Sequence, residues 1–225
     1  MTETSCPMPR TMRNMELPQR MRRLPRDEHG YPIPWFVATL DDGSRDFRIA
    51  SADRQHDARR FGLCWVCGSE LGRYKAFPVG PMCAVNRVSS EPPCHLECAT
   101  YSARCCPFLA TPQMVRREGG KPDRLIDAAG HAILRNPGVT VVWLSLTSRP
   151  FRAQVGRPGW LWDIGAPAQV FWYAQGRKAT REEILTSIDT GLPALHEACQ
   201  LDRDPAGALA ELDRQLNEAM GLVPA

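Results

Sequence analysis

Two pairs of soft metal ligands, each spaced by two residues, are the side chains of this chain best suited to chemistry. Cys64 and Cys67 form the first pair, and His95 and Cys98 form the second, with 27 residues between the pairs. Three thiolates and one imidazole are a ligand set of tetrahedral zinc in structural sites. The spacing therefore predicts one closed Zn²⁺ site that holds the surrounding chain together.

The residues next to each pair indicate how the ligands are positioned. Gly68 directly follows the second cysteine, and a tight turn there can aim both sulfurs at one point. Pro92 and Pro93 precede His95, so His95 and Cys98 should project from the first turn of a helix, at positions i and i+3. A cysteine knuckle followed by a helix start is typical of a treble-clef arrangement.

Other interpretations of these cysteines stay open. The chain has nine cysteines, and buried free thiols behave as small hydrophobic side chains. A redox C-x-x-C needs a strand-to-helix context, whereas turn residues follow Cys67. Cys94 competes with His95, although its spacing to Cys98 fits less well. The further cysteines that could replace a ligand are Cys83 and Cys105.

Length and composition indicate a folded protein of one large domain or two small ones. The chain has 225 residues, of which 43% are hydrophobic, and no run reaches the ~20 apolar residues that cross a membrane. Residues 1–26 contain no apolar stretch of the signal-peptide type. The odd number of cysteines and their metal-type spacing favour a reducing cytoplasm over a secreted disulfide framework. We expect no membrane partner.

Charge is unevenly distributed along the chain. From residue 181 to the end there are 3 basic and 9 acidic residues, a net of −6; because the whole chain carries +3, the first 180 residues carry +9. A basic body suits contact with DNA or RNA. The basic residues nearest the predicted metal site in sequence are Arg59, Arg60, Arg73, Lys75, Arg87 and Arg104. Of these, we expect the last four to contact nucleic acid, beside aromatic side chains that could stack on bases or pack the core.

The pattern of turns and apolar residues predicts an α+β fold: an N-terminal β-hairpin with a treble-clef-like zinc site, then a small sheet covered by C-terminal helices. Residues 1–26 read as extended or disordered, and residues 113–138 as a loop-rich linker. The hairpin and the zinc site fall in residues 27–112, and the sheet with its helices falls in residues 139–225.

Individual elements follow from local signals. The predicted strands are 35–40 and 45–50 around an Asp-Gly turn, 75–79 at a sheet edge because of Pro78, 139–146 in a sheet centre, 151–155 and 160–164. The predicted helices are 51–60, the ligand-bearing 94–106, one opened by the capping box at Thr180 and stopped at Gly191, and one after Asp204-Pro205.

Catalytic motifs are incomplete in this sequence. A treble-clef nuclease needs a histidine between the two ligand pairs, and none occurs there. His95-Leu96-Glu97 supplies the H-x-E of a zinc deaminase, but no P-C-x-x-C follows. Phosphate-binding glycine motifs are missing as well. In an enzyme, the catalytic residues would have to come from segments far from the cysteines in sequence, such as His29, His56 or His131. We therefore expect a protein that is not an enzyme.

Several stretches resemble a group of uncharacterised bacterial proteins that are often associated with phages or prophages. The stretches are 24–27, 30–37, 64–68, 80–86, 91–95, 106–109 and 176–183, so the resemblance runs from about residue 20 to residue 200. Its most specific part is the Cys-x-x-Cys and Pro-Pro-x-His-x-x-Cys pattern, which supports His95 and Cys98 as the second pair. The resemblance implies a phage-type accessory protein that binds DNA or a host protein.

These observations together predict a non-enzymatic, zinc-stabilised binding protein that contacts nucleic acid or a host complex that handles nucleic acid. The alternatives are a treble-clef nuclease or other hydrolase, and a protein–protein adaptor that uses the acidic C-terminal helices. The oligomeric state and the identity of the partner stay open.

Overall fold

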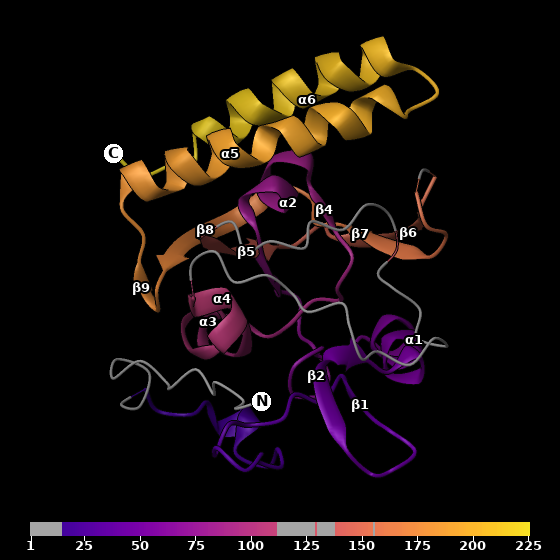
Figure 1. Ribbon diagram of the computed structural model, residues 1–225, viewed down its shortest axis with the longest axis vertical. Helices are drawn as coiled ribbons and strands as arrows, with labels where there is room; N and C mark the ends of the chain where they lie inside the picture. Colours follow the sequence, from indigo (N-terminus) through magenta and orange to yellow (C-terminus); the bar gives the residue numbers. More distant parts are fainter. Residues whose placement is uncertain (1–14, 112–128, 130–137, 155) are drawn as a thin grey trace, which may run out of the picture.

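A four-stranded antiparallel sheet runs through the middle of the molecule, with helices on both of its sides (Figure 1). The computed structural model describes residues 15–111, 129, 138–154 and 156–225. The strands of the sheet lie in the order β3 (Lys75–Val79), β5 (Thr140–Ser145), β8 (Pro167–Ala174) and β9 (Arg177–Lys178). The mixed α+β class is as expected, and β3 lies at an edge, where a strand tolerates Pro78.

Strand β5 separates two hydrophobic cores. All six of its residues are buried, because side chains alternate between the two faces of a strand and both faces are covered. Val141 and Trp143 belong to the core beneath the C-terminal helices, which we name the helix-side core. Val142 and Leu144 belong to the core that contains the cysteine cluster, which we name the metal-side core. The expectation of a central strand here is confirmed.

Helices α2 (Pro81–Asn86), α5 (Arg181–Gln200) and α6 (Pro205–Met220) cover the helix-side core (Figure 1). The capping box at Thr180 is present, since its side chain accepts the Glu183 N–H and the Glu183 carboxylate accepts the Thr180 N–H. Asp204 caps α6 by accepting the Gly207 N–H.

The predicted end of α5 at Gly191 is wrong, because the helix continues to Gln200. A Cβ on Gly191 would lie 2.8 Å from Met82 of α2, so this glycine allows the two helices to approach closely. Pro193 also lies inside the helix, at a cost of ~3 kcal/mol in a helix interior. Burial of Ile188 and Leu195 on either side of these two residues favours continuation of the helix.

The opposite side of the sheet carries α3 (Leu96–Cys105), α4 (Pro107–Ala110), α1 (Ala52–Phe61) and the hairpin of β1 (Val37–Thr39) and β2 (Arg45–Ala50) (Figure 1). The hairpin turn contains Gly43 at a positive φ of 81°, as an Asp-Gly turn requires. The predicted hairpin, polar helix and ligand-bearing helix are therefore all present. Residues 15–26, expected to be extended or disordered, include a 3-10 turn at Gln19–Met21, and Met21 is buried in the metal-side core.

A three-stranded sheet completes the fold, in the order β4 (Val88–Ser89), β7 (Trp160–Asp163) and β6 (Arg149–Arg152). Strands were expected at 160–164 and 151–155; the first coincides with β7, whereas β6 begins two residues earlier than expected. The predicted linker 113–138 lies almost entirely outside the described residues. The segments before and after it share one sheet, because β3 pairs with β5. No helix in the described part of the chain is long and apolar enough to span a membrane.

Candidate metal centre

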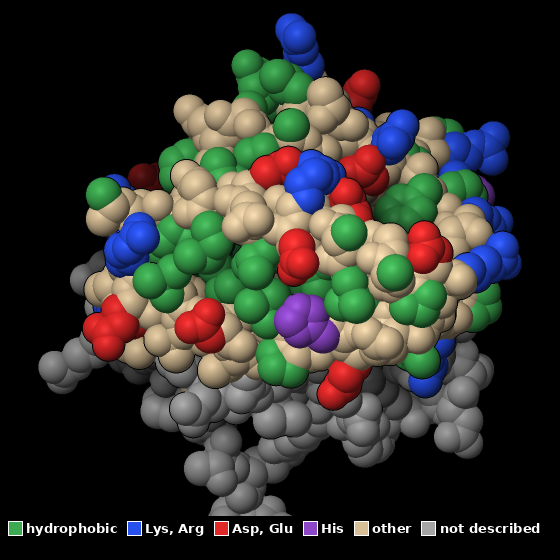
Figure 2. Space-filling view, turned by 90° about the horizontal axis from the view of Figure 1, so that it is seen from above, with side chains coloured by type: hydrophobic (Ala, Val, Ile, Leu, Met, Phe, Trp, Pro, Cys, Tyr) green, Lys and Arg blue, Asp and Glu red, His purple; other side chains and the backbone are tan. Residues whose placement is uncertain are grey.

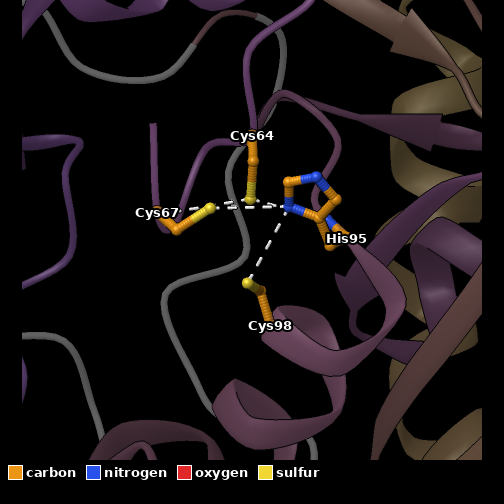
Figure 3. Close-up of side chains that lie close together, drawn as sticks. All are labelled: Cys64, Cys67, His95 and Cys98. Carbon is orange, nitrogen blue, oxygen red and sulfur yellow. Dashed lines mark hydrogen bonds between the residues drawn. The ribbon is translucent and has the colours of Figure 1, made fainter. Parts of the chain in front are cut away.

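Four buried side chains from two segments converge on one point in the metal-side core (Figure 3). The Sγ atoms of Cys64, Cys67 and Cys98 and a ring nitrogen of His95 all lie within 4.8 Å of one another. The Nδ1 atom of His95 is 3.5 Å from Cys67 Sγ and 4.0 Å from Cys98 Sγ. The four predicted ligands are thus positioned to hold a metal ion.

The first pair of ligands is held in a tight knuckle. The Cys64 N–H donates to the Ser69 carbonyl and the Gly68 N–H donates to the Cys64 carbonyl, at 2.7 and 2.8 Å. Gly68 has a positive φ of 70°, and a Cβ there would lie 2.6 Å from the Trp35 ring. Only glycine allows both the positive φ of the turn and the close approach of the Trp35 ring, which explains why a glycine follows Cys67.

His95 occupies the N-cap position of α3 and uses its ring for the cluster. Its side chain makes no capping hydrogen bond. Instead, Nε2 lies 3.0 Å from the Glu70 carbonyl oxygen. Because a carbonyl can only accept, Nε2 carries the proton and Nδ1 keeps its lone pair, which faces the sulfurs. This contact fixes the ring orientation that metal binding requires.

The sulfur atoms are strongly coupled. The pKa of Cys64 lies far below its ordinary value because its neighbours, above all Cys67, donate hydrogen bonds to its sulfur. The pKa values of Cys67 and Cys98 are raised, first because each donates to Cys64. Burial and the charge of that sulfur raise them further. Three thiolates so close together would repel one another, and a divalent cation bound among them would stabilise all three.

The competing cysteines lie outside the cluster of four. Cys94 is fully buried, and its pKa is raised well above the ordinary value, chiefly because its thiol donates a hydrogen bond to Cys64. Its backbone forms an isolated bridge with Ala76 of β3. Cys83 packs against the helix-side core, and Cys105 lies at the end of α3 with its Sγ 4.0 Å from Met15 Sδ. None of the eight cysteines in the described part of the chain forms a disulfide.

One contact to the knuckle comes from the N-terminal segment that was predicted to be extended or disordered. The Arg23 guanidinium donates to the Cys67 carbonyl at 3.0 Å and to the Ser69 hydroxyl at 2.6 Å. Arg23 lies more than 40 residues before the knuckle, so spacing along the chain could not reveal this contact. The N-terminal segment therefore helps to fix the metal-binding turn.

The four residues expected to contact nucleic acid do not form one patch. The side chain of Arg87 is only 15% exposed and makes contacts within the protein. Its guanidinium carbon lies 4.4 Å from the centre of the Trp143 ring, and the guanidinium pairs with Glu218 at 3.3 Å. It lines a hollow of about 600 Å³ between α6 and the small sheet, where basic and acidic side chains alternate. Arg104 donates to the Gly176 carbonyl. Arg73 is exposed and Lys75 is half-buried, at the start of β3.

Neither of the two described histidines considered for hydrolysis belongs to a cluster of potential metal ligands. His29 is exposed beside Glu28, and His56 lies on α1 beside Arg59. His131 lies outside the described residues. Among the residues that the structure describes, the Cys64 cluster is the one group of three or more His, Cys, Asp or Glu side chains that could hold a metal ion.

Comparison of the chain with protein-family models, with curated proteins and with solved structures found no match. Function is therefore inferred from the chemistry and placement of this chain's own residues.

Proposed function

We propose that the protein is a non-enzymatic binding protein, stabilised by one structural zinc ion, whose partner is nucleic acid. The observation that carries the proposal is the closed, buried set of three sulfurs and one nitrogen. A catalytic zinc site keeps one position for water or substrate, whereas four protein ligands fill a tetrahedral ion.

The distances support zinc as the metal. Zn–S and Zn–N bonds of about 2.3 and 2.0–2.1 Å at a tetrahedral angle put sulfur and nitrogen about 3.6 Å apart. The observed separations from His95 Nδ1 are 3.5 Å to Cys67 Sγ and 4.0 Å to Cys98 Sγ. Mixed thiolate and imidazole ligands also favour zinc over the harder magnesium and calcium ions. Bound there, zinc would supply folding energy and a fixed geometry for the knuckle and α3.

A treble-clef arrangement is the local fold that we assign to this region. The knuckle lies at residues 64–67, and the second pair of ligands lies at the N-cap and in the first turn of α3. Strand β3 falls between the two pairs. With zinc bound, this arrangement would give rigid support to the metal-side core, in which most buried side chains are cysteine or alanine.

Charge separation supports nucleic acid as the partner. The acidic excess of the chain lies in α5 and α6, which cover one side of the central sheet. In Figure 2, which looks onto that side, acidic and hydrophobic side chains intermix over the helices, and several basic side chains gather toward the end where Figure 1 shows β6 and β7. Lys and Arg away from the acidic helices suit contact with phosphates. The resemblance to phage-associated proteins agrees with an accessory role of this kind.

The test is binding of the zinc-loaded full chain to fluorescein-labelled DNA, followed by fluorescence anisotropy. We expect binding at low salt that weakens by at least tenfold between about 50 and about 200 mM NaCl, because bound phosphates release counterions. Elemental mass spectrometry of the same sample should give about one zinc per chain. A chain that contains zinc but binds neither single-stranded nor duplex DNA at low salt would contradict the nucleic-acid proposal.

A protein–protein adaptor is the second candidate function, and the outer face of α5 and α6 favours it. Leu201, which follows α5, is 62% exposed, and Met220 at the end of α6 is 37% exposed. Hydrophobic and acidic side chains intermix over these helices in Figure 2, and such a mixed surface is typical of protein contacts. Pull-down with a basic partner protein, in the absence of DNA binding, would favour this function.

A further inference from the structure

Two guanidinium groups lie over one indole where helix α1 meets the three-stranded sheet. The guanidinium carbon of Arg59 is 4.1 Å from the centre of the Trp160 ring, and that of Arg152 is 4.3 Å from it. Arg152 and Trp160 are direct cross-strand partners in β6 and β7, whereas Arg59 comes from the last turn of α1. The fold thus joins three segments that are far apart in the sequence.

Neither guanidinium in this cluster pairs with an acidic side chain of the described residues. Within the residues that the structure describes, no carboxylate lies within ion-pair distance of Arg59 or Arg152. Arg149, on the same strand as Arg152, pairs with Asp163 at 3.2 Å. Two like charges stacked on one ring repel each other, and an anion placed between them would relieve that repulsion. The Arg59–Trp160–Arg152 cluster therefore favours a negatively charged ligand.

A hollow of about 100 Å³ lies beside the cluster and adds an aromatic, hydrogen-bonding surface. It is lined by Ala52, Gln55, His56, Arg59, Trp160 and Trp162. Trp160 is half-buried, so part of its surface reaches solvent, and the side chains of Gln55 and His56 lie at the same hollow. Such a surface accepts the edge and face of a flat heterocycle, which an acidic peptide does not offer.

We propose that the Arg59–Trp160–Arg152 cluster is a binding surface for single-stranded nucleic acid. The two guanidinium groups contact phosphates, and an unpaired base stacks at Trp160 and its neighbouring guanidinium. Single strands are favoured over duplexes because stacked, paired bases do not present their faces to a protein side chain. The inference rests on the proposed function, since it names the surface and the class of nucleic acid for the same binding activity.

The experiment compares variants of the zinc-loaded full chain for binding to labelled oligothymidylate. Arg59→Gln with Arg152→Gln should lower the affinity at least tenfold and reduce the slope of log affinity against log salt by about 1.4, which is about 0.7 for each lost phosphate contact. Trp160→Leu should lower the affinity about 5- to 150-fold with little change in that slope, because stacking releases no counterions.

The matched control is Lys178→Gln with Arg181→Gln, which removes the same charge from exposed positions in β9 and at the start of α5. It should bind like the unchanged protein. Zinc content and the far-UV circular dichroism spectrum must be the same for all variants, so that lost binding reports the surface and not the fold.

The outcomes separate this inference from the proposed function. If the unchanged protein binds oligothymidylate and the Arg59/Arg152 double variant binds equally well, the nucleic-acid function stands and this surface is wrong. If duplex DNA binds as tightly as the single strand and Trp160→Leu has no effect, stacking is wrong. If the unchanged protein binds no nucleic acid at low salt, both proposals fail. If polyglutamate competes as well as oligothymidylate at equal charge, the surface is a general anion site and the inference is overturned.

Discussion

The two sides of strand β5 are stabilised in different ways. On the metal side, eight of the thirteen fully buried hydrophobic residues are cysteine or alanine. The helix-side core contains no fully buried cysteine among the described residues, and it includes Trp143, Ile184 and Ile188. Because hydrophobic stabilisation scales with buried apolar area at about 25 cal/mol per Å², small side chains give little of it. A bound metal ion would therefore compensate for the smaller apolar area that is buried on the metal side.

Removal of the metal should produce the largest difference between the two sides. Structural zinc contributes apparent binding energy of about 10–16 kcal/mol, so chelation or Cys67→Ser should unfold the hairpin, the knuckle and α3. Hydrogen exchange followed by mass spectrometry should show this loss of protection in residues 33–105, and a smaller loss in α5 and α6.

Cys83→Ser is the control, because this cysteine packs on the helix-side core. It should keep one zinc per chain. Equal loss of protection on both sides after chelation would show that the two cores fold as one unit and would weaken the comparison.

Ile188→Ala should damage the helix-side core instead. Its side chain is 1% exposed, and truncation of a buried isoleucine costs about 2–5 kcal/mol. Urea unfolding should show that loss while zinc content under native conditions stays unchanged. Leu201→Ala, at the exposed residue that follows α5, should change the free energy of unfolding by at most about 0.5 kcal/mol. Zinc loss from Ile188→Ala in buffer would contradict the separation of the two cores.

Two glycines on the metal side have similar backbone angles but different surroundings. Gly68 and Gly62 have similar positive φ angles of 70° and 64°, but only Gly68 faces the Trp35 ring; the position of a Cβ on Gly62 is open. Gly62→Ala should cost about 1–2 kcal/mol of backbone strain, and Gly68→Ala should cost more and weaken zinc binding. Competition with a chromogenic chelator measures the affinity, and equal affinities for the two variants would remove the role assigned to Trp35.

The smallest effect concerns the start of α5. Hydrogen bonds from Arg177 lower the pKa of Glu183 from 4.5 to about 2. Because the pKa is lower in the folded state, the stabilisation is complete above about pH 4.5 and is lost as the pH falls toward 2. Glu183→Gln should therefore lower the free energy of unfolding by about 1 kcal/mol at pH 7, and this difference should shrink in acid. A difference independent of pH would assign the effect to the hydrogen bonds of the cap alone.

The sequence predicted the ligands because their geometry is local. Cys-x-x-Cys with a following glycine specifies a turn, and a ligand pair three residues apart specifies a helix start, so neither needs knowledge of distant residues. The end of α5 was wrong because Gly191 is explained by Met82, more than 100 residues earlier, and not by the helix that contains it. Strand β8 was not anticipated, because its pairing with β5 is what orders its mixed pattern of buried and exposed residues.

The Arg59–Trp160–Arg152 cluster could not be found from the sequence for a related reason. Arg59 was noted as one basic residue among several, and Trp160 was placed in a strand, but nothing along the chain links them. Their proximity depends on how α1 packs beside the three-stranded sheet, which is a tertiary feature.

The outer edge of strand β3 is covered by a residue of the metal side. Its inner edge pairs with β5, while at its outer edge the backbone of Ala76 exchanges two hydrogen bonds with Cys94, the residue before a metal ligand. An unpaired strand edge can recruit a strand from another molecule, and Pro78 alone blocks only one of its N–H groups. If Cys94 moved away when no ion is bound, this edge would become a template for intermolecular pairing. Aggregation of the metal-free chain would then begin at β3.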